Sequence, residues 1–186
     1  MSTLAGNFVN ASPIGDMTAF FIALNACIAI EGPGGARSIF LKNLYRGYKD
    51  LDLAKDEFVS ALSFPLPAPN SHFNFEKVSK RTHLDIASVN SALLITLENE
   101  TISELQLSAG GIGPVPTFLE KTCAYLTGKT LNAPNIRAAQ EILQTEISPI
   151  SDVRGWAEYK RLLLRQLFYA HFIRLFPNSI TLNLLR

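Results

Sequence analysis

The amino-acid sequence predicts an α+β fold, in which small antiparallel sheets are packed by helices. Segments with strand character come in pairs that turn back on themselves, without the repeated strand–helix–strand order of a parallel sheet. Segments with helical periodicity follow the last of these strands. A proline-rich stretch also separates two groups of strands. The prediction is therefore two consecutive α+β units.

The first unit begins with a polar segment at residues 3–16. It is dense in Gly, Asn and Ser, which favour loops, and Asp16 stands at an N-cap position before an apolar run. The run from residue 17 predicts a short helix. Residues 27–30 and 38–41 predict the two arms of a hairpin around a glycine-rich turn. The polar segment is thus expected to be a loop that leads into a helix.

A further strand and a linker complete the first unit. Residues 57–64 alternate between apolar and polar and predict a strand, after a loop at residues 45–55. Three prolines within residues 65–70 favour extended chain over regular structure. We therefore predict a boundary in this stretch, with one unit over residues 1–66 and a second over residues 72–178.

The second unit is predicted as strands followed by helices. The predicted strands are residues 74–79, 87–97 and 102–108, and the predicted helices are residues 117–126, residues 134–146 and a last helix that begins at Ser151 and Asp152. Thr117, Ser151 and Asp152 are expected to cap these helices. One stripe of the last helix is expected to face the core, and it comprises Trp156, Tyr159, Leu163, Leu167, Ala170 and Ile173.

The composition is that of an ordinary folded protein without a nucleic-acid-binding surface. Hydrophobic residues make up 47% of the chain, charged residues 18%, and the formal net charge is +1. Cys27 and Cys123 stand alone in apolar segments, as expected of core residues in a reducing cytoplasm. No signal peptide opens the chain, and charges interrupt the apolar residues 162–176, so no membrane span is expected.

No catalytic side chain and no metal site can be assigned from the sequence. The histidines have no metal-ligand spacing to one another or to a cysteine. No Gly-x-Ser-x-Gly motif is present, and the glycine pair at residues 34–35 lacks the Lys-Ser or Lys-Thr of a phosphate-binding loop. These patterns therefore indicate no nucleophile, general base or metal ligand.

The order of residues in the polar segment resembles a known cofactor loop. Gly6-Asn7, then Ala-Ser-Pro at residues 11–13, then Asp16 are similar to a stretch in the FAD-binding domain of molybdenum hydroxylases, the xanthine dehydrogenases most of all. In that family the loop wraps the flavin cofactor. The resemblance assigns FAD contacts to Thr3, Leu4, Ala5, Gly6, Asn7 and Asp16, with Asn10 and Ser12 as further candidates. Ala5 departs from a glycine that is common in the family.

Two later motifs resemble the same family. Lys-Val-Ser-Lys-Arg at residues 77–81 is similar to a segment that carries a lysine close to the flavin, and the resemblance places that role on Lys77. Such a cation can stabilise negative charge on a reduced flavin. A solvated charge cluster of Lys77, Lys80 and Arg81 is the alternative. Val59 matches an apolar position against the cofactor, and a plain core role is the alternative. The motif at residues 151–154 opens the last helix and is expected to be structural, with Arg154 paired to Glu158.

The resemblance implies an FAD-dependent oxidoreductase component. It predicts the carboxyl-terminal part of an FAD-binding domain followed by a carbon monoxide dehydrogenase flavoprotein-like subdomain. The complete enzyme would pass electrons from a molybdenum centre through iron–sulfur clusters to FAD and then to NAD. The family's glycine-rich pyrophosphate-binding subdomain, iron–sulfur domain and molybdopterin-carrying subunit are not in this sequence, so the chain is expected to be an inactive fragment with an incomplete FAD site. Two alternatives stay open: a carbon monoxide or nicotine-type dehydrogenase flavoprotein, and a non-catalytic assembly module.

Overall fold

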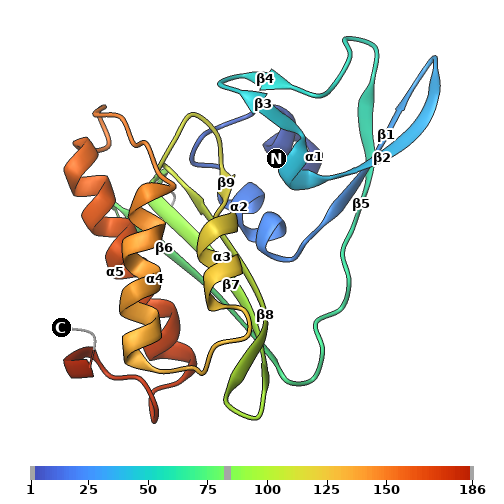
Figure 1. The fold of residues 1–186 in the computed structure, drawn as a ribbon. Coiled ribbons are helices and arrows are strands. Elements are labelled where there is room, and N and C mark those ends of the chain that lie inside the picture. Colours follow the sequence, from blue (N-terminus) through green and yellow to red (C-terminus); the bar gives the residue numbers. More distant parts are fainter. Residues whose placement is uncertain (1–2, 82–84, 185–186) are drawn as a thin grey trace.

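A four-stranded antiparallel sheet is the centre of the computed structural model, which describes residues 3–81 and 85–184 (Figure 1). Its strands, in spatial order, are β6 (Ser71–Ser79), β7 (Ala87–Glu98), β8 (Thr101–Gly110) and β9 (Thr117–Phe118). The first ten residues of β7 are all buried, because this strand lies in the middle of the sheet and both of its faces are covered. The predicted α+β class is confirmed.

Three helices cover one face of this sheet (Figure 1). They are α3 (Glu120–Leu126), α4 (Ala133–Thr145) and α5 (Ala157–Leu175), followed by the short η2 (Leu182–Leu184). Leu93 and Ile95 of β7 pack in this core with Leu164, Phe168 and Phe172 of α5, and all five are fully buried.

A second core lies on the opposite face of the same sheet. Helix α2 (Asp16–Ala23) packs across β7 and β8 there, and Leu94 of β7 joins Phe8 and Ile22 in this second cluster. Leu94 stands between two residues that face the first core, as expected from the alternation of side chains along a strand. Strand β7 therefore contributes side chains to both cores.

The first unit adds a small sheet that projects away from the large one (Figure 1). Its strands lie in the order β2 (Gly35–Phe40), β1 (Cys27–Gly32) and β5 (Phe58–Ser63), and the remaining elements are α1 (Leu4–Val9), η1 (Leu41–Asn43), β3 (Tyr45–Gly47) and β4 (Asp50–Leu51). The hairpin and the strand at residues 57–64 are confirmed. The loop predicted at residues 45–55 contains the small β3–β4 hairpin. Periodicity did not indicate this hairpin, because its strands are short and Lys49 has a positive φ of 59°.

The prediction of an uninterrupted loop at residues 3–16 is wrong. The Thr3 hydroxyl accepts the Gly6 N–H at 3.0 Å, and this N-cap starts the short helix α1. Asp16 is not an N-cap either. Gly15 has the N-cap position, and Asp16 is the first helical residue of α2.

Two helix starts in the second unit also differ from the prediction. Thr117 belongs to β9, so α3 begins only at Glu120. Helix α5 begins at Ala157, because Gly155 has a φ of 149° in a turn that closes on Asp152. Ser151 still caps this helix from a distance, since its hydroxyl accepts the Ala157 N–H at 3.1 Å.

The apolar stripe predicted on α5 is only partly correct. Leu163 and Leu167 are buried, but Trp156 is 76% exposed and Tyr159 is 45% exposed. The late start of the helix explains the exposure of Trp156, which precedes the first turn, whereas Tyr159 lies in that turn and still faces away from the core.

The predicted linker has no regular secondary structure, and residues 65–70 are exposed. The boundaries at residues 1–66 and 72–178 remain a prediction. Cys27 and Cys123 are free thiols, and burial raises the pKa of Cys123 to about 12. None of the helices within the described residues is long and apolar enough to cross a membrane.

Candidate functional site

An ion pair joins the two predicted flavin-site residues that carry charge. Lys77 Nζ lies 2.6 Å from Asp16 Oδ2, although 61 positions separate these residues in sequence. Asp16 stands in the first turn of α2, where the helix dipole favours a negative charge, and Lys77 reaches it from β6. Both side chains keep more than a quarter of their surface exposed, 28% for Lys77 and 29% for Asp16, so a ligand can reach them.

The second oxygen of Asp16 is held by Asn90, a residue that the sequence reasoning missed. Asn90 Nδ2 donates to Asp16 Oδ1 at 2.6 Å and to the Ile14 carbonyl at 3.2 Å. Asn90 lies on β7 and is fully buried. A buried Asn inside an apolar strand is the only sequence signal that could have indicated it.

The turn before α2 is hydrogen-bonded to the residue that follows β8. Gly111 N–H donates to the Pro13 carbonyl at 2.8 Å. A Cβ at Gly111 would lie 2.3 Å from the Ser88 carbonyl oxygen and 3.0 Å from Ile14, and its φ is 83°. Only glycine fits this conformation without strain. The second unit thus fixes the segment that the first unit contributes to the site.

Asn7 keeps an amide group available for a ligand. Its Oδ1 accepts the Thr18 hydroxyl at 3.4 Å, while its Nδ2 has no hydrogen-bond partner among the residues that the structure describes. Tyr45 lies 3.2 Å from Thr18 and donates to the Phe8 carbonyl at 3.2 Å. Burial raises the pKa of Tyr45 to about 12, so this hydroxyl keeps its proton and braces α1.

The other predicted residues surround α1 or lie further away. Leu4 and Gly6 are exposed in α1, and Ala5 is half-buried beside them. The Asn10 carbonyl accepts a hydrogen bond from Lys49 Nζ. The Ser12 hydroxyl accepts the Ile14 N–H at 3.4 Å. Val59 lies on β5 and packs against the second core, which contains α2.

Arg154 supports the lysine through Asp85 and not through the predicted pair with Glu158. Lys77 Nζ also donates to the Asp85 carbonyl at 2.7 Å. The Asp85 carboxylate is 5% exposed and accepts Arg154 Nη1 at 3.3 Å. Burial favours the neutral acid, but backbone N–H donors at Arg81 and Ile86, with Arg154, lower the pKa of Asp85 to about 2. The motif at residues 151–154 therefore holds Asp85, whose carbonyl accepts Lys77.

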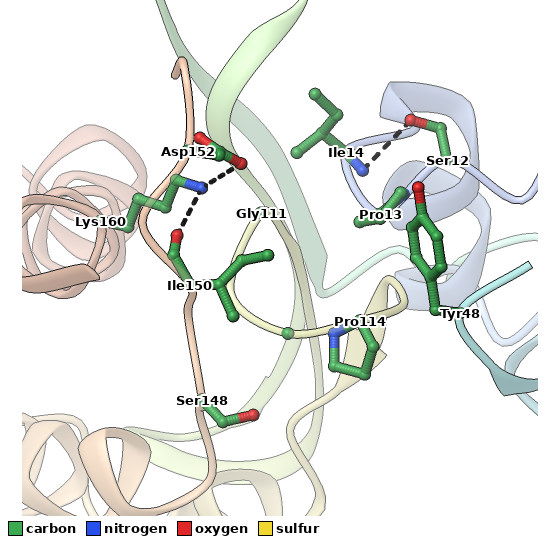
Figure 2. Close-up of a pocket in the computed structure, with 11 residues that line it drawn as sticks. Ser12, Pro13, Ile14, Tyr48, Gly111, Pro114, Ser148, Ile150, Asp152 and Lys160 are labelled. Atoms are coloured by element: carbon green, nitrogen blue, oxygen red, sulfur yellow. Dashed lines mark hydrogen bonds and ion pairs between the residues drawn. The ribbon is translucent and has the colours of Figure 1, made fainter. Parts of the chain in front are cut away.

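A cavity of about 780 Å³ lies beside the site, where the two units face each other (Figure 2). Ser12, Pro13, Ile14 and Tyr48 form one side in Figure 2, and Ser148, Ile150, Asp152 and Lys160 form the other. Lys160 is 2% exposed, and its Nζ donates to Asp152 Oδ2 at 2.7 Å and to the Ile150 carbonyl at 2.9 Å. The wall is otherwise largely apolar.

The residues at the Asp16–Lys77 pair fit a flavin nucleotide. Lys77 has three N–H groups, of which two are used by Asp16 and Asp85, so one can still donate. Asn7 Nδ2 supplies a second available donor. The carbonyl groups of an isoalloxazine ring are acceptors that such donors suit, and Gly6 lets a flat ring approach the backbone. No group of His, Cys, Asp and Glu within the described residues could hold a metal ion.

Two family profiles match the chain. The profile for the FAD binding domain in molybdopterin dehydrogenase matches residues 1–67, and the profile for the CO dehydrogenase flavoprotein C-terminal domain matches residues 74–175. Together they cover the α1–Asp16 segment, the Lys77 strand and the Arg154 motif.

Known proteins of this kind are similar over nearly the whole chain. Xanthine dehydrogenase of Blastobotrys adeninivorans is 30% identical over 92% of this chain, and the carbon monoxide dehydrogenase medium chain of Afipia carboxidovorans is 28% identical over 86%. The chain spans 13% of the first relative and 55% of the second. Among solved structures, CO dehydrogenase from Oligotropha carboxidovorans aligns with a TM-score of 0.88 and 25% identity, over 94% of this chain and 61% of that one.

Proposed function

This chain belongs to the family of CO dehydrogenase-type flavoproteins, and on that premise we propose that it forms the FAD-binding part of a molybdenum hydroxylase. The observation that carries the proposal is the 2.6 Å contact between Asp16 and Lys77. A sequence resemblance assigned both residues to a flavin, and folding brings them together from two units at an accessible edge.

Different residues of this chain are proposed to contact different parts of FAD. We assign Asp16 to the polar chain of the cofactor, and Asn7 with the α1 segment to its ring. Lys77 supplies a cation that stabilises negative charge on the ring by preorganised electrostatics. Bound FAD would supply the two-electron redox chemistry. The full set of assigned residues is Thr3, Leu4, Ala5, Gly6, Asn7, Asn10, Ser12, Asp16, Val59 and Lys77.

The complete enzyme is proposed to be xanthine dehydrogenase-like, relaying electrons from iron–sulfur clusters through FAD to NAD. Its partners would be an iron–sulfur domain and a molybdenum-cofactor subunit. The cavity beside Ser12 supports a small-molecule acceptor, because its volume of about 780 Å³ suits a nucleotide and Tyr48 offers an exposed ring for stacking. Cytoplasmic location stays a prediction, which the two free thiols support.

A carbon monoxide or nicotine-type dehydrogenase is the second candidate. The 28% identity to the carbon monoxide dehydrogenase medium chain favours it, since the match covers 86% of this chain and 55% of that relative. The identity of the molybdenum subunit that co-purifies with this chain separates the two candidates. A subunit that oxidises purines supports the first.

The test of the flavin assignment is the visible spectrum of the complete polypeptide that carries this sequence, purified and saturated with FAD. The proposal predicts a yellow protein that retains about one FAD per chain after desalting. A folded but colourless protein would support the third possibility, an assembly module without a cofactor.

A further inference from the structure

Asn90 places a fully buried side-chain amide directly behind Asp16. Both of its N–H groups are committed to the segment before α2, one to Asp16 Oδ1 at 2.6 Å and one to the Ile14 carbonyl at 3.2 Å. The shorter bond runs to a carboxylate, and charge-assisted bonds of this kind are the strong ones.

The other end of the same amide has no partner. Asn90 Oδ1 is buried and accepts no hydrogen bond from any described residue. A buried acceptor without a donor lowers stability, so an apolar side chain of the same shape would suit the strand better. The exception indicates that the two N–H groups have a role that outweighs the unsatisfied oxygen.

The orientation of the amide is fixed by its surroundings. Turning the amide over would bring Oδ1 against the Asp16 carboxylate and the Ile14 carbonyl, which are both acceptors, so it would lose both bonds. Gly110 pairs with Asn90 across β7 and β8, and a Cβ there would lie 2.5 Å from Oδ1. The absence of a side chain at Gly110 makes the room in which Oδ1 sits.

We propose that Asn90 is a positioning residue, which holds the Asp16 carboxylate in the rotation that presents Oδ2 to Lys77 and to the flavin. Each Asp16 oxygen has its own partner, Oδ1 with Asn90 and Oδ2 with Lys77. Without the donor behind it, the carboxylate is free to rotate, and Lys77 then keeps only its bond to the Asp85 carbonyl. This inference rests on the proposed FAD site.

The test is a double-mutant cycle on FAD affinity in the complete polypeptide. Asn90→Leu keeps the volume and removes both the donors and the orphan oxygen. It is expected to raise the Kd for FAD on the order of 10-fold, the effect of losing one charge-assisted bond. Because Asn90 acts through Asp16, adding it to Asp16→Ala should raise the Kd no further than Asp16→Ala alone. Additive effects, or an unchanged Kd in Asn90→Leu, overturn the proposal.

A matched control and a second variant separate positioning from stability. Thr96→Val removes a hydrogen-bonding hydroxyl from the far end of β7, where Thr96 lies 2.8 Å from Ser71 Oγ, and should leave the Kd within about 2-fold. An equal loss of affinity in this control overturns the proposal. If Asn90→Leu does not fold, Gly110→Ala decides, since its Cβ pushes Oδ1 aside without removing a polar group. An unchanged Kd in Gly110→Ala also overturns the proposal.

A measurement without FAD distinguishes this proposal from the proposed function. If the unaltered protein binds no FAD, the proposed function fails. The placement is then judged from the ¹³Cγ resonance of Asp16 in the flavin-free protein. The chemical shift of that resonance should change in Asn90→Leu and stay the same in Thr96→Val. An Asp16 chemical shift that is unchanged in Asn90→Leu contradicts the positioning role.

Discussion

At the scale of single residues, two aspartates with similar ion pairs are expected to do different things. Asp16 pairs with an accessible lysine, and Asp152 pairs with Lys160, whose side chain is 3% exposed. We predict that Asp16→Ala weakens FAD retention about 10-fold or more, and more than Asp152→Ala does. Asp152→Ala should lower the free energy of unfolding by about 1–3 kcal/mol, because it leaves a buried ammonium unpaired.

Equilibrium dialysis with FAD and thermal melting of both variants check this contrast. Equal loss of FAD in the two variants, or no loss in Asp16→Ala, contradicts the assignment of Asp16 to the site.

His171 gives the fold a dependence on pH. Its ring is fully buried, with Nε2 3.0 Å from Ser91 Oγ and Nδ1 2.9 Å from Asn74 Nδ2, and burial lowers its pKa to about 3. The unfolded chain takes up the proton near pH 6.5, whereas the folded chain stays neutral. Stability is therefore complete above about pH 6.5 and is lost as the pH falls toward 3.

We predict a loss of about 2 kcal/mol in unfolding free energy between pH 7 and pH 5, measured by urea denaturation. His171→Gln removes the titrating group and should flatten this slope. The exposed His72 is the control, since His72→Gln should leave the slope as it is. A wild-type protein equally stable at both pH values contradicts the neutral buried state.

At the scale of elements, the contact between the end of β8 and the turn before α2 depends on Gly111. A Cβ at Gly111 would lie 2.3 Å from the Ser88 carbonyl oxygen in a backbone with φ of 83°. We predict that Gly111→Ala lowers the unfolding free energy by about 1–3 kcal/mol and weakens FAD retention. Gly34→Ala is the matched control, because a Cβ there has open space and should cost well under 1 kcal/mol.

Chemical denaturation of the two alanine variants compares them directly. If the Gly111→Ala variant is as stable as the Gly34→Ala variant, the contact between β8 and the turn before α2 does not hold the site in place.

Periodicity predicted the long elements and failed where local turns decide. The strands of the large sheet and α4 follow from alternation and helical spacing. Helix α1 has six residues and depends on a single cap from Thr3, so no periodic signal marks it. The start of α5 depends on the turn at Gly155, which shifted the helix past its predicted caps.

The site shows the same limit. The polar segment and Lys77 could be found in the sequence by resemblance, but spacing alone could not show that Lys77 reaches Asp16 across 61 positions. Asn90 was missed because its role depends on contacts with Asp16 and Ile14, which lie more than 70 positions away in the sequence. Arg154 was paired with Glu158 from helical spacing, although it lies before α5 begins and contacts Asp85.

At the scale of the whole molecule, β7 contributes side chains to both cores. Leu93 packs in the core beneath α5, and its neighbour Leu94 packs in the core beneath α2. We predict a single unfolding transition in calorimetry, and Leu94→Ala should lower the stability of both cores by about 2–5 kcal/mol. Two separated transitions, with only the first unit affected by Leu94→Ala, would contradict a shared strand.

The arrangement of the whole chain explains why the flavin assignment needs both units. Asp16 and Asn7 come from the first unit, while Lys77, Asn90 and Gly111 come from the large sheet. A change that separates the units should therefore abolish FAD binding.

The most direct test of the proposed flavin site is the structure of the complete polypeptide with FAD bound. We predict that the flavin lies against α1, with its polar groups in hydrogen-bond contact with Asn7, Asp16 and Lys77. A flavin bound elsewhere, with the Asp16–Lys77 pair unchanged and facing solvent, would contradict it.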